Sequence, residues 1–572
     1  MSDYDLKYKN KYLKYKNKYL NLLSQIGGNE GSTDDILNLL SFFNSDWDFF
    51  NSDWDLGKFY EKYFFVENNK KIYNKLIDDN NITSFNFSNY KITKNFIQNI
   101  TEFLKINNKI MTINLRSINP PIGNNGAIKL ANVLITRGIL SELIIRNNSI
   151  GNDGAIAIAE VLKQNNGLKK LDIAINLIGI DGATAIAEAL KENRGLTILN
   201  IGKNQIGIDG ATAIAEALKE NRGLTILNIG KNKIGDEGAI AIAEALKTNE
   251  HLIELDIGGN EIGDNGAIEI AKALFKNKVL TTLDIGDNDI TQHGAKVMAL
   301  ALKKNQKLTI LIISLNKIND IGAIAEALKI NKGLTTLEIN FNHIGDKGAI
   351  LLAEILKINT RLTKLDIGYT KIGDDGAEAI ASALKTNTNL KELNIEHNLF
   401  RYRGAKAIAE SLKINTHLTK LNISSNLYNV EKTEAIEIAK VIAEVLKINT
   451  HLTNLKYRVN QIGDEGAIAI AEALKTNEHL IELDIEGNKI GEGATAIFTA
   501  LITESDTSKT KLQQLSLNNN QITANTMIQI VDALKRNKTL THVDLRNNLG
   551  KKNEEINTII NNEIKEKIIL IN

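Results

Sequence analysis

Apolar and polar positions along the chain follow one pattern that recurs about every 28 residues. In the unit at 206–232, Leu227-Asn228-Ile229 alternates apolar and polar residues as a short strand does. Ahead of this strand, other apolar residues fall on one face of a helix, namely Ala211, Ile214, Ala215 and Leu218. Each unit therefore predicts one strand and one helix. Because a unit of this size cannot bury its own apolar side, neighbouring units must stack.

The repeat is close to identical in places. Residues 178–204 and 206–232 share one sequence, and so do 234–257 and 462–485. Each unit ends on the last position of L-x-x-L-x-L-x-x-N, which falls at Asn148, Asn176, Asn204, Asn232, Asn260, Asn288, Asn316, Asn342, Thr370, Asn398, Asn426, Asn460, Asn488, Asn520 and Asn548. The step is 28 except for steps of 26, 34 and 32 that end at Asn342, Asn460 and Asn520. Degenerate units around Phe85 and Ile113 bring the total to about seventeen.

This pattern resembles the ribonuclease-inhibitor class of leucine-rich repeats. The resemblance covers residues 81–549, and it implies an α/β solenoid of horseshoe form with a concave parallel sheet and an outer ring of helices. The recurring asparagine is expected to hydrogen-bond neighbouring backbone where each strand turns away, since buried backbone groups need partners.

The two ends of the chain depart from the repeat. Residues 1–28 contain KYKNKYL twice, at 7–13 and 14–20, and resemble the openings of proteins from mimivirus-like giant viruses. This basic stretch is either a solvated helix without a partner, a delivery tag, or a coiled coil that makes the chain self-associate through residues 7–20. The aromatic-rich residues 29–80 predict an N-terminal cap, and 550–572 predict a C-terminal capping helix.

The composition of the chain says more about its cellular location than about its function. The 572 residues contain no Cys and carry a net charge of +1, from 69 Lys plus Arg against 68 Asp plus Glu. Disulfides and thiolate metal sites are therefore excluded. With neither a signal peptide nor an apolar run of about 20 residues, we expect an intracellular protein without a membrane span. If the protein is viral, we expect it in the host cytoplasm, and association with the virion is a second possibility.

Motifs for chemistry are missing from the sequence. There is no G-x-x-x-x-G-K-[ST] loop, no G-x-S-x-G and no H-E-x-x-H. Four histidines recur immediately before the first Leu of a strand, which favours a structural or neutral role, namely His251, His417, His451 and His479. We therefore expect no enzyme, no cofactor and no metal.

The strand alternation predicts which side chains reach the concave face. If the leucines point inward, the residues between them point outward, and these are mostly acidic or amide, among them Asp256, Asp284 and Asp366. Such a face repels nucleic acid and suits a protein partner with a basic surface. The alternative is that these residues serve only solubility and strand spacing.

One interruption of that face is apolar. Five large residues are predicted on adjacent strands, namely Ile310, Ile312, Leu315, Phe341 and Tyr369. A contiguous exposed apolar patch is typical of a contact site. The 26-residue unit lies here as well, so a packing irregularity that buries some of these side chains is the competing interpretation.

The sequence thus favours a non-catalytic protein–protein interaction scaffold that binds a host or viral protein on its concave face. One alternative is a GTPase-activating protein of Ran type, although the chain has no long acidic tail. A second is a substrate adaptor of a ubiquitin ligase, although the Leu-Pro opening of an F-box is missing. Assays of GTP hydrolysis with small GTPases separate the first alternative from the scaffold, and affinity capture without residues 1–80 separates the second.

Overall fold

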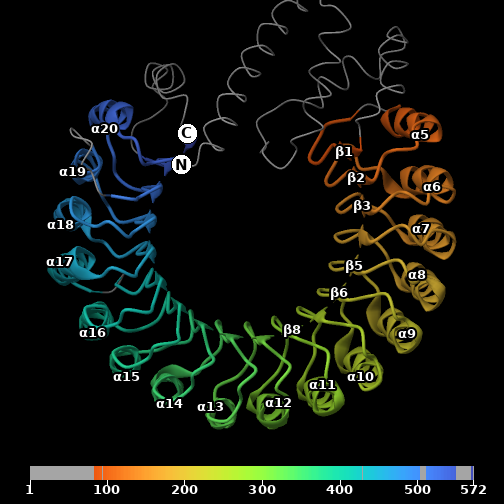
Figure 1. Ribbon diagram of the computed structural model, residues 1–572, viewed down its shortest axis with the longest axis horizontal. Helices are drawn as coiled ribbons and strands as arrows, with labels where there is room; N and C mark the ends of the chain where they lie inside the picture. The colour runs from red at the N-terminus through yellow and green to blue at the C-terminus, as the bar shows by residue number, and fades with distance from the viewer. Residues whose placement is uncertain (1–82, 93–94, 428–429, 503–509, 549–567, 571–572) are drawn as a thin grey trace, which may run out of the picture. The chain divides into compact units, whose positions relative to one another are not determined.

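The computed structural model describes residues 83–92, 95–427, 430–502, 510–548 and 568–570 (Figure 1). The predicted segments at 1–28 and 29–80 lie outside the described residues. The described chain divides into two compact units, with the boundary between Glu254 and Leu255. Both units repeat one strand and one helix, as the sequence predicts.

The first unit alternates three-residue strands with helices of 11 to 14 residues. Its elements are β1 (Ser84–Asn86), α5 (Phe96–Ile106), β2 (Thr112–Asn114), α6 (Gly123–Leu134), β3 (Glu142–Ile144), α7 (Asn152–Gln164), β4 (Lys170–Asp172), α8 (Ile180–Glu192), β5 (Ile198–Asn200), α9 (Gly207–Glu220), β6 (Ile226–Asn228) and α10 (Gly235–Leu246). Strands β1 to β6 pair in parallel, each with the next along the chain.

The second unit continues the same alternation after β7 (Glu254–Asp256), which contains the boundary. Its elements are α11 (Asp264–Lys276), β8 (Thr282–Asp284), α12 (Gln292–Lys304), β9 (Ile310–Ile312), α13 (Gly322–Leu328), β10 (Thr336–Glu338), α14 (Gly345–Leu356), β11 (Lys364–Asp366), α15 (Asp374–Leu384), β12 (Glu392–Asn394), α16 (Tyr402–Ser411), β13 (Lys420–Asn422), α17 (Lys432–Ile448), β14 (Asn454–Lys456), α18 (Gly463–Leu474), β15 (Glu482–Asp484), α19 (Gly493–Ala500), β16 (Gln514–Ser516), α20 (Ala524–Arg536), β17 (His542–Asp544) and β18 (Ile568–Leu570). Within the predicted capping helix at 550–572, the structure describes only β18, a strand that pairs in parallel with β17.

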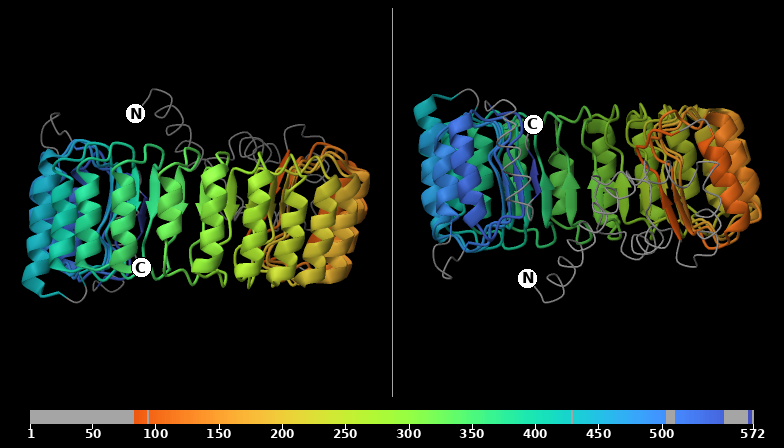
Figure 2. Two further views of the ribbon diagram at one scale, coloured as in Figure 1. Left: turned by 90° about the horizontal axis from the view of Figure 1, so that it is seen from below. Right: turned by 90° about the horizontal axis from the view of Figure 1, so that it is seen from above.

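In each unit the strands form one layer and the helices form the other, side by side and in the same direction (Figures 1 and 2). The middle residue of every strand from β1 to β17 is buried, for example Leu227 in β6, where the residues on either side are partly exposed. Helix α9 buries Ala211, Ile214 and Leu218 against this layer. The core therefore lies between the sheet and the helices, as the predicted alternation requires.

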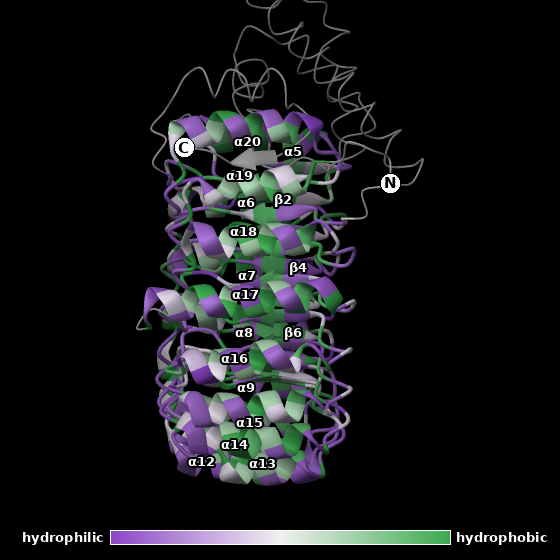
Figure 3. Ribbon diagram, turned by 90° about the vertical axis from the view of Figure 1, so that its left-hand side faces the viewer, coloured by the Kyte–Doolittle hydropathy of each residue, from purple (hydrophilic) through white to green (hydrophobic). Residues whose placement is uncertain are grey.

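The helices approach one another closely because small residues line their contacts. A Cβ added at Gly210 would lie 3.0 Å from the Cβ of Ala183 in the preceding helix, and no ordinary side chain fits there without a shift. The loops at the edges of the repeats are mostly hydrophilic, whereas the helices carry both kinds of residue (Figure 3). No helix among the described residues is long and apolar enough to cross a membrane.

Buried asparagines join each repeat to the next, as the sequence predicts. The Nδ2 of Asn232 donates to the carbonyl of Ile229 in its own repeat at 2.9 Å and to that of Ile201 in the preceding repeat at 3.1 Å. Its Oδ1 accepts from the backbone N–H of Asn204 at 3.1 Å. These bonds satisfy backbone groups that the turn after each strand would otherwise leave buried and unpaired.

A second asparagine ladder, which the sequence analysis missed, follows the helices. The Nδ2 of Asn221 donates to the carbonyls of Leu190 and Asn193 at 2.6 and 2.9 Å, and its Oδ1 accepts from the N–H of Leu224 at 2.8 Å. The signal is present in the sequence, because an asparagine recurs three residues before the first Leu of most strands.

Changes in repeat length are taken up on the helix side. The 26-residue repeat contains the seven-residue helix α13, and the 34-residue repeat contains the 17-residue helix α17. Strands β9 and β10 nevertheless pair in the ordinary register, with Leu311 opposite Leu337. The sheet at the predicted apolar patch is therefore regular.

Candidate functional site

Two rows of side chains run across the sheet face of the second unit. The strand row is formed by the last residue of each strand, namely Asp256, Asp284, Ile312, Glu338 and Asp366. The turn row is formed by the residue that precedes each buried asparagine or threonine of the first ladder, namely Leu315, Phe341, Tyr369 and His397. The parallel register places Asp284, Ile312, Glu338 and Asp366 side by side on successive strands.

The predicted apolar residues divide between strand and turn. Ile310 and Ile312 lie on β9 and are partly exposed. The sequence predicted Leu315 on a strand as well, but this prediction is wrong: Leu315 lies three residues beyond the end of β9, with a φ of 54°. The reason is that the strand is only three residues long, after which the chain turns to bury Asn316.

The turn row holds bulky side chains in a left-handed backbone conformation. Phe341 and Tyr369 both have a φ of 55°. This region costs a non-glycine residue roughly 1–2 kcal/mol, and other repeats place Gly259 or Gly487 there. Burial does not offset the cost, because Leu315 is 48% exposed and Phe341 39% exposed. Lys203 and Val459 adopt the same conformation in their repeats, so it belongs to the turn itself, and what distinguishes this stretch is the size of its exposed apolar side chains.

Three rings of the turn row form a continuous stack. The ring centroids of Phe341 and Tyr369 are 4.1 Å apart, with 11° between the planes. Those of Tyr369 and His397 are also 4.1 Å apart, at 13°. His397 was not among the predicted residues, although it occupies the same position in the next repeat. The stack fixes the rings at the rim of the sheet face.

Carboxylates crowd the strand row beside these rings. The pKa of Asp284 is raised to about 6, mainly by burial. The hydrogen bond from the Gly286 N–H lowers this pKa, whereas the charges of Asp256, Glu338 and Asp287 add to the rise. The pKa of Asp366 is also raised, by burial first and by Glu338 and Glu396 as well. Burial of the carboxyl groups is the main cause of both shifts, and repulsion between like charges along the row acts in the same direction.

One lysine partly offsets this negative charge. The Nζ of Lys364 lies 2.7 Å from Glu338 Oε1, and this contact is the main cause of the raised pKa of Lys364. Glu396 is held instead by amides, with Asn422 Nδ2 at 2.9 Å and Asn394 Nδ2 at 3.3 Å. The face near the rings thus remains acidic.

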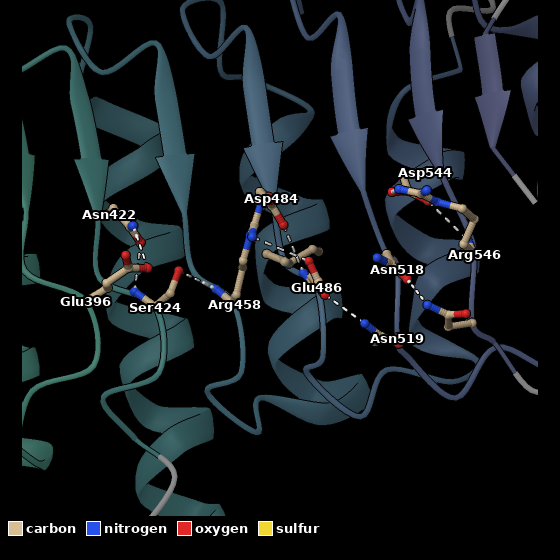
Figure 4. Close-up of polar contacts among 12 residues, drawn as sticks. Glu396, Asn422, Ser424, Arg458, Asp484, Glu486, Asn518, Asn519, Asp544 and Arg546 are labelled. Atoms are coloured by element: carbon tan, nitrogen blue, oxygen red, sulfur yellow. Dashed lines mark hydrogen bonds and ion pairs between the residues drawn. The ribbon is translucent and has the colours of Figure 1, made fainter. Parts of the chain in front are cut away.

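Farther along the same unit, arginines neutralise the carboxylates. Arg458 Nε donates to Asp484 Oδ2 at 2.6 Å, and Arg458 Nη1 lies 3.6 Å from Glu486 Oε2 (Figure 4). Arg546 pairs with Asp544 at 2.7 Å. The sheet face therefore has an acidic part with rings, on β8–β12, and an ion-paired part on β14–β17.

The arrangement offers a surface for contact. Among the residues that the structure describes, no group of three or more histidines and carboxylates is placed to hold a metal ion. What the two rows present is a rim of stacked rings beside half-buried carboxylates.

Comparison with known proteins identifies the repeat. The leucine-rich-repeat family model matches at 140–159, 192–215, 220–243, 248–271, 276–299, 304–325, 331–353, 359–381, 386–409, 449–471 and 476–498. No curated protein matches the chain. Among solved structures, the chain is similar to one described as the leiomodin-1 actin-binding site 2, at 27% identity over 27% of this chain and 86% of that one. The TM-score of 0.24 is too low for this likeness to bear on function.

Proposed function

We propose that this leucine-rich-repeat protein is a non-catalytic scaffold that binds a protein partner on the sheet face of its second unit. Leucine-rich repeats generally mediate protein–protein interaction. The observation that carries the proposal is the stack of Phe341 on Tyr369, in which Phe341 is exposed and Tyr369 is partly exposed. Aromatic anchors set in a polar surface are typical of binding hot spots.

The partner has a basic surface on this proposal. Asp256, Asp284 and Asp366 lie on the strand row beside the rings, and the pKa of Asp284 is raised by burial first and by the neighbouring carboxylates as well. A basic partner would relieve this repulsion on docking and would be attracted from a distance.

The wider setting is proposed on the same grounds. Strand–helix repeats of mostly 28 residues support the ribonuclease-inhibitor type. The repeated KYKNKYL supports an origin in a giant virus of mimivirus type, and with it a place in the host cytoplasm or the virion, where the partner is a host or viral protein.

The test uses a double variant. Phe341→Ala with Tyr369→Ala should weaken binding of the captured partner by about 2 kcal/mol or more, while the thermal melt stays close to that of the wild type. Val459→Ala is the matched control, because Val459 is 42% exposed at the same position of another repeat, with a φ of 50°. Unchanged partners at unchanged yield from the double variant would overturn the proposal.

A further inference from the structure

The ion-paired part of the sheet face shows how this fold receives a guanidinium group. Arg458 stands one repeat before Glu486, and it reaches across to Asp484, the last residue of β15, and to Glu486 two residues beyond that strand. Its planar fork can pair with two carboxylates at once, which an ammonium group cannot do in the same way.

The same position in the acidic part has no side chain. Gly368 stands one repeat before Glu396, as Arg458 stands one repeat before Glu486. A Cβ at Gly368 would lie 3.1 Å from Glu396 Cγ and 3.4 Å from Asp366 Oδ1. The Nδ2 of Asn394 lies 3.4 Å away as well, so Asp366, Asn394 and Glu396 all border a position where the chain supplies no side chain of its own.

The ring stack borders this position. The N–H of Tyr369 donates to the carbonyl of Glu396 at 2.9 Å, and the Glu396 charge contributes to the raised pKa of Tyr369, after burial. Because Phe341 and His397 cover the two faces of Tyr369, the ring edges form an apolar ridge beside the carboxylates. Such a ridge suits the apolar stem of a long basic side chain.

We infer that the turn row and the carboxylates of Glu396 and Asp366 together receive an arginine side chain of the protein partner. The stem lies along Phe341 and Tyr369, and the guanidinium group pairs with Glu396, which occupies the position of Glu486. Asn394 occupies the position of Asp484, so the second carboxylate is that of Asp366, in the same repeat as Gly368. This inference rests on the proposed function and adds the partner's chemistry, an exposed segment that carries arginine.

The first experiment compares two peptides of equal charge on the full chain. Binding of hexaarginine and hexalysine, both capped at their ends, is measured by fluorescence anisotropy at physiological salt. We expect hexaarginine to bind about tenfold more tightly, since bidentate pairing distinguishes arginine from lysine. Equal affinities, or no binding of hexaarginine, would overturn the inference.

Variants locate the site. Glu396→Gln and Asp366→Asn should each weaken hexaarginine binding by about fivefold or more, whereas Glu486→Gln, at a carboxylate already covered by Arg458, should leave it unchanged. If the wild type and Glu396→Gln bind hexaarginine equally well, Glu396 is not part of the binding site and the proposed site is wrong.

A substitution at Gly368 tests directly whether a guanidinium group fits this position. Gly368→Arg supplies the guanidinium group from the chain itself, so it should abolish hexaarginine binding. Gly368→Ala introduces the same Cβ near Glu396 without the charge and should retain binding. If both variants bind hexaarginine as the wild type does, the guanidinium site is wrong.

The outcomes separate this inference from the proposed function. Loss of partner binding in Phe341→Ala with Tyr369→Ala, together with equal peptide affinities, rejects arginine but keeps the scaffold. Unchanged partner binding in that double variant rejects the scaffold itself.

Discussion

At the scale of single residues, one position of the repeat places aspartate in two opposite environments. Asp284 is partly buried among carboxylates, and its pKa is raised to about 6. Asp484 occupies the same position on β15, where it is 4% exposed and paired with Arg458. The same residue type therefore opposes folding in one repeat and supports it in the other.

Replacing Asp284 should stabilise the protein in a pH-dependent way. A carboxyl whose pKa is higher in the folded than in the unfolded state opposes folding when ionised, fully above about pH 6. Asp284→Asn removes this charge and keeps an oxygen for the Gly286 N–H, so the free energy of unfolding at about pH 7.5 should rise by about 1–3 kcal/mol. The gain should shrink as the pH falls from about 6 to about 4, which urea denaturation across that range measures.

The control is Asp484→Asn, which breaks the ion pair with Arg458 and should lower the free energy of unfolding by about 1 kcal/mol or more. Stabilisation by both variants, or a gain at Asp284 that does not change with pH, would contradict this account.

Leu315 allows the strain of the turn row to be measured. Asparagine adopts the left-handed region more readily than leucine, and the Leu315 side chain is 48% exposed, so it loses little burial on replacement. We expect Leu315→Asn to leave the free energy of unfolding unchanged or to raise it by up to about 1 kcal/mol. Leu311→Ala on the adjacent strand, at a fully buried side chain, should lower it by about 2–5 kcal/mol. A loss above about 1 kcal/mol in Leu315→Asn would show that the leucine serves stability.

At the scale of elements, the repeat pattern predicts strands and helices well because each one is marked by its own periodicity. Leu227 is buried and Asn228 faces outward, as alternation predicts. The turn row was predicted less well, since periodicity says nothing of a backbone that leaves the strand after three residues. The stack of Tyr369 on His397 depends on contacts between repeats. An ion pair such as that of Arg458 with Asp484 likewise depends on which side chains meet across neighbouring strands.

The first asparagine ladder contains one substitution that tests its energetics. Thr370 has a single hydroxyl donor, which reaches the carbonyl of Ile367 in its own repeat at 2.6 Å. Asn342 instead reaches its own repeat and the preceding one, at Ile339 and Ile313, both at 3.0 Å. Thr370→Asn adds a donor toward the preceding repeat and should raise the free energy of unfolding by about 1 kcal/mol.

The reciprocal variant Asn342→Thr removes one such donor and should cost about 1 kcal/mol, because the buried carbonyl of Ile313 loses one of its two donors and keeps the other, Asn316 Nδ2 at 3.1 Å. Chemical denaturation of the two variants beside the wild type provides the measurement. Equal and opposite changes are not required, but destabilisation by Thr370→Asn would mean that the local backbone does not admit the asparagine geometry.

At the scale of the whole molecule, local charge matters more than net charge. The chain is almost neutral, with a net charge of +1, yet its second unit gathers carboxylates on β8–β12 and neutralises those on β14–β17 with its own arginines. Long-range attraction falls off over about 8–10 Å at physiological salt, so a basic partner responds to this part of the face and not to the average over the chain.

The two rows should therefore act on different steps of binding, which surface plasmon resonance with the captured partner can separate. Replacing Asp256 and Asp284 together by asparagine should mainly lower the association rate constant and flatten its dependence on salt, since these two carboxylates lie outside the proposed guanidinium site and act before contact. Phe341→Ala with Tyr369→Ala should leave the association rate constant within about threefold and raise the dissociation rate constant by about 30-fold, which corresponds to about 2 kcal/mol. If the carboxylate variant changes only dissociation, the strand row is part of the contact itself and does not steer the partner. If the ring variant changes only association, the stack does not hold the complex, and the side chains that do so must lie elsewhere on the sheet face.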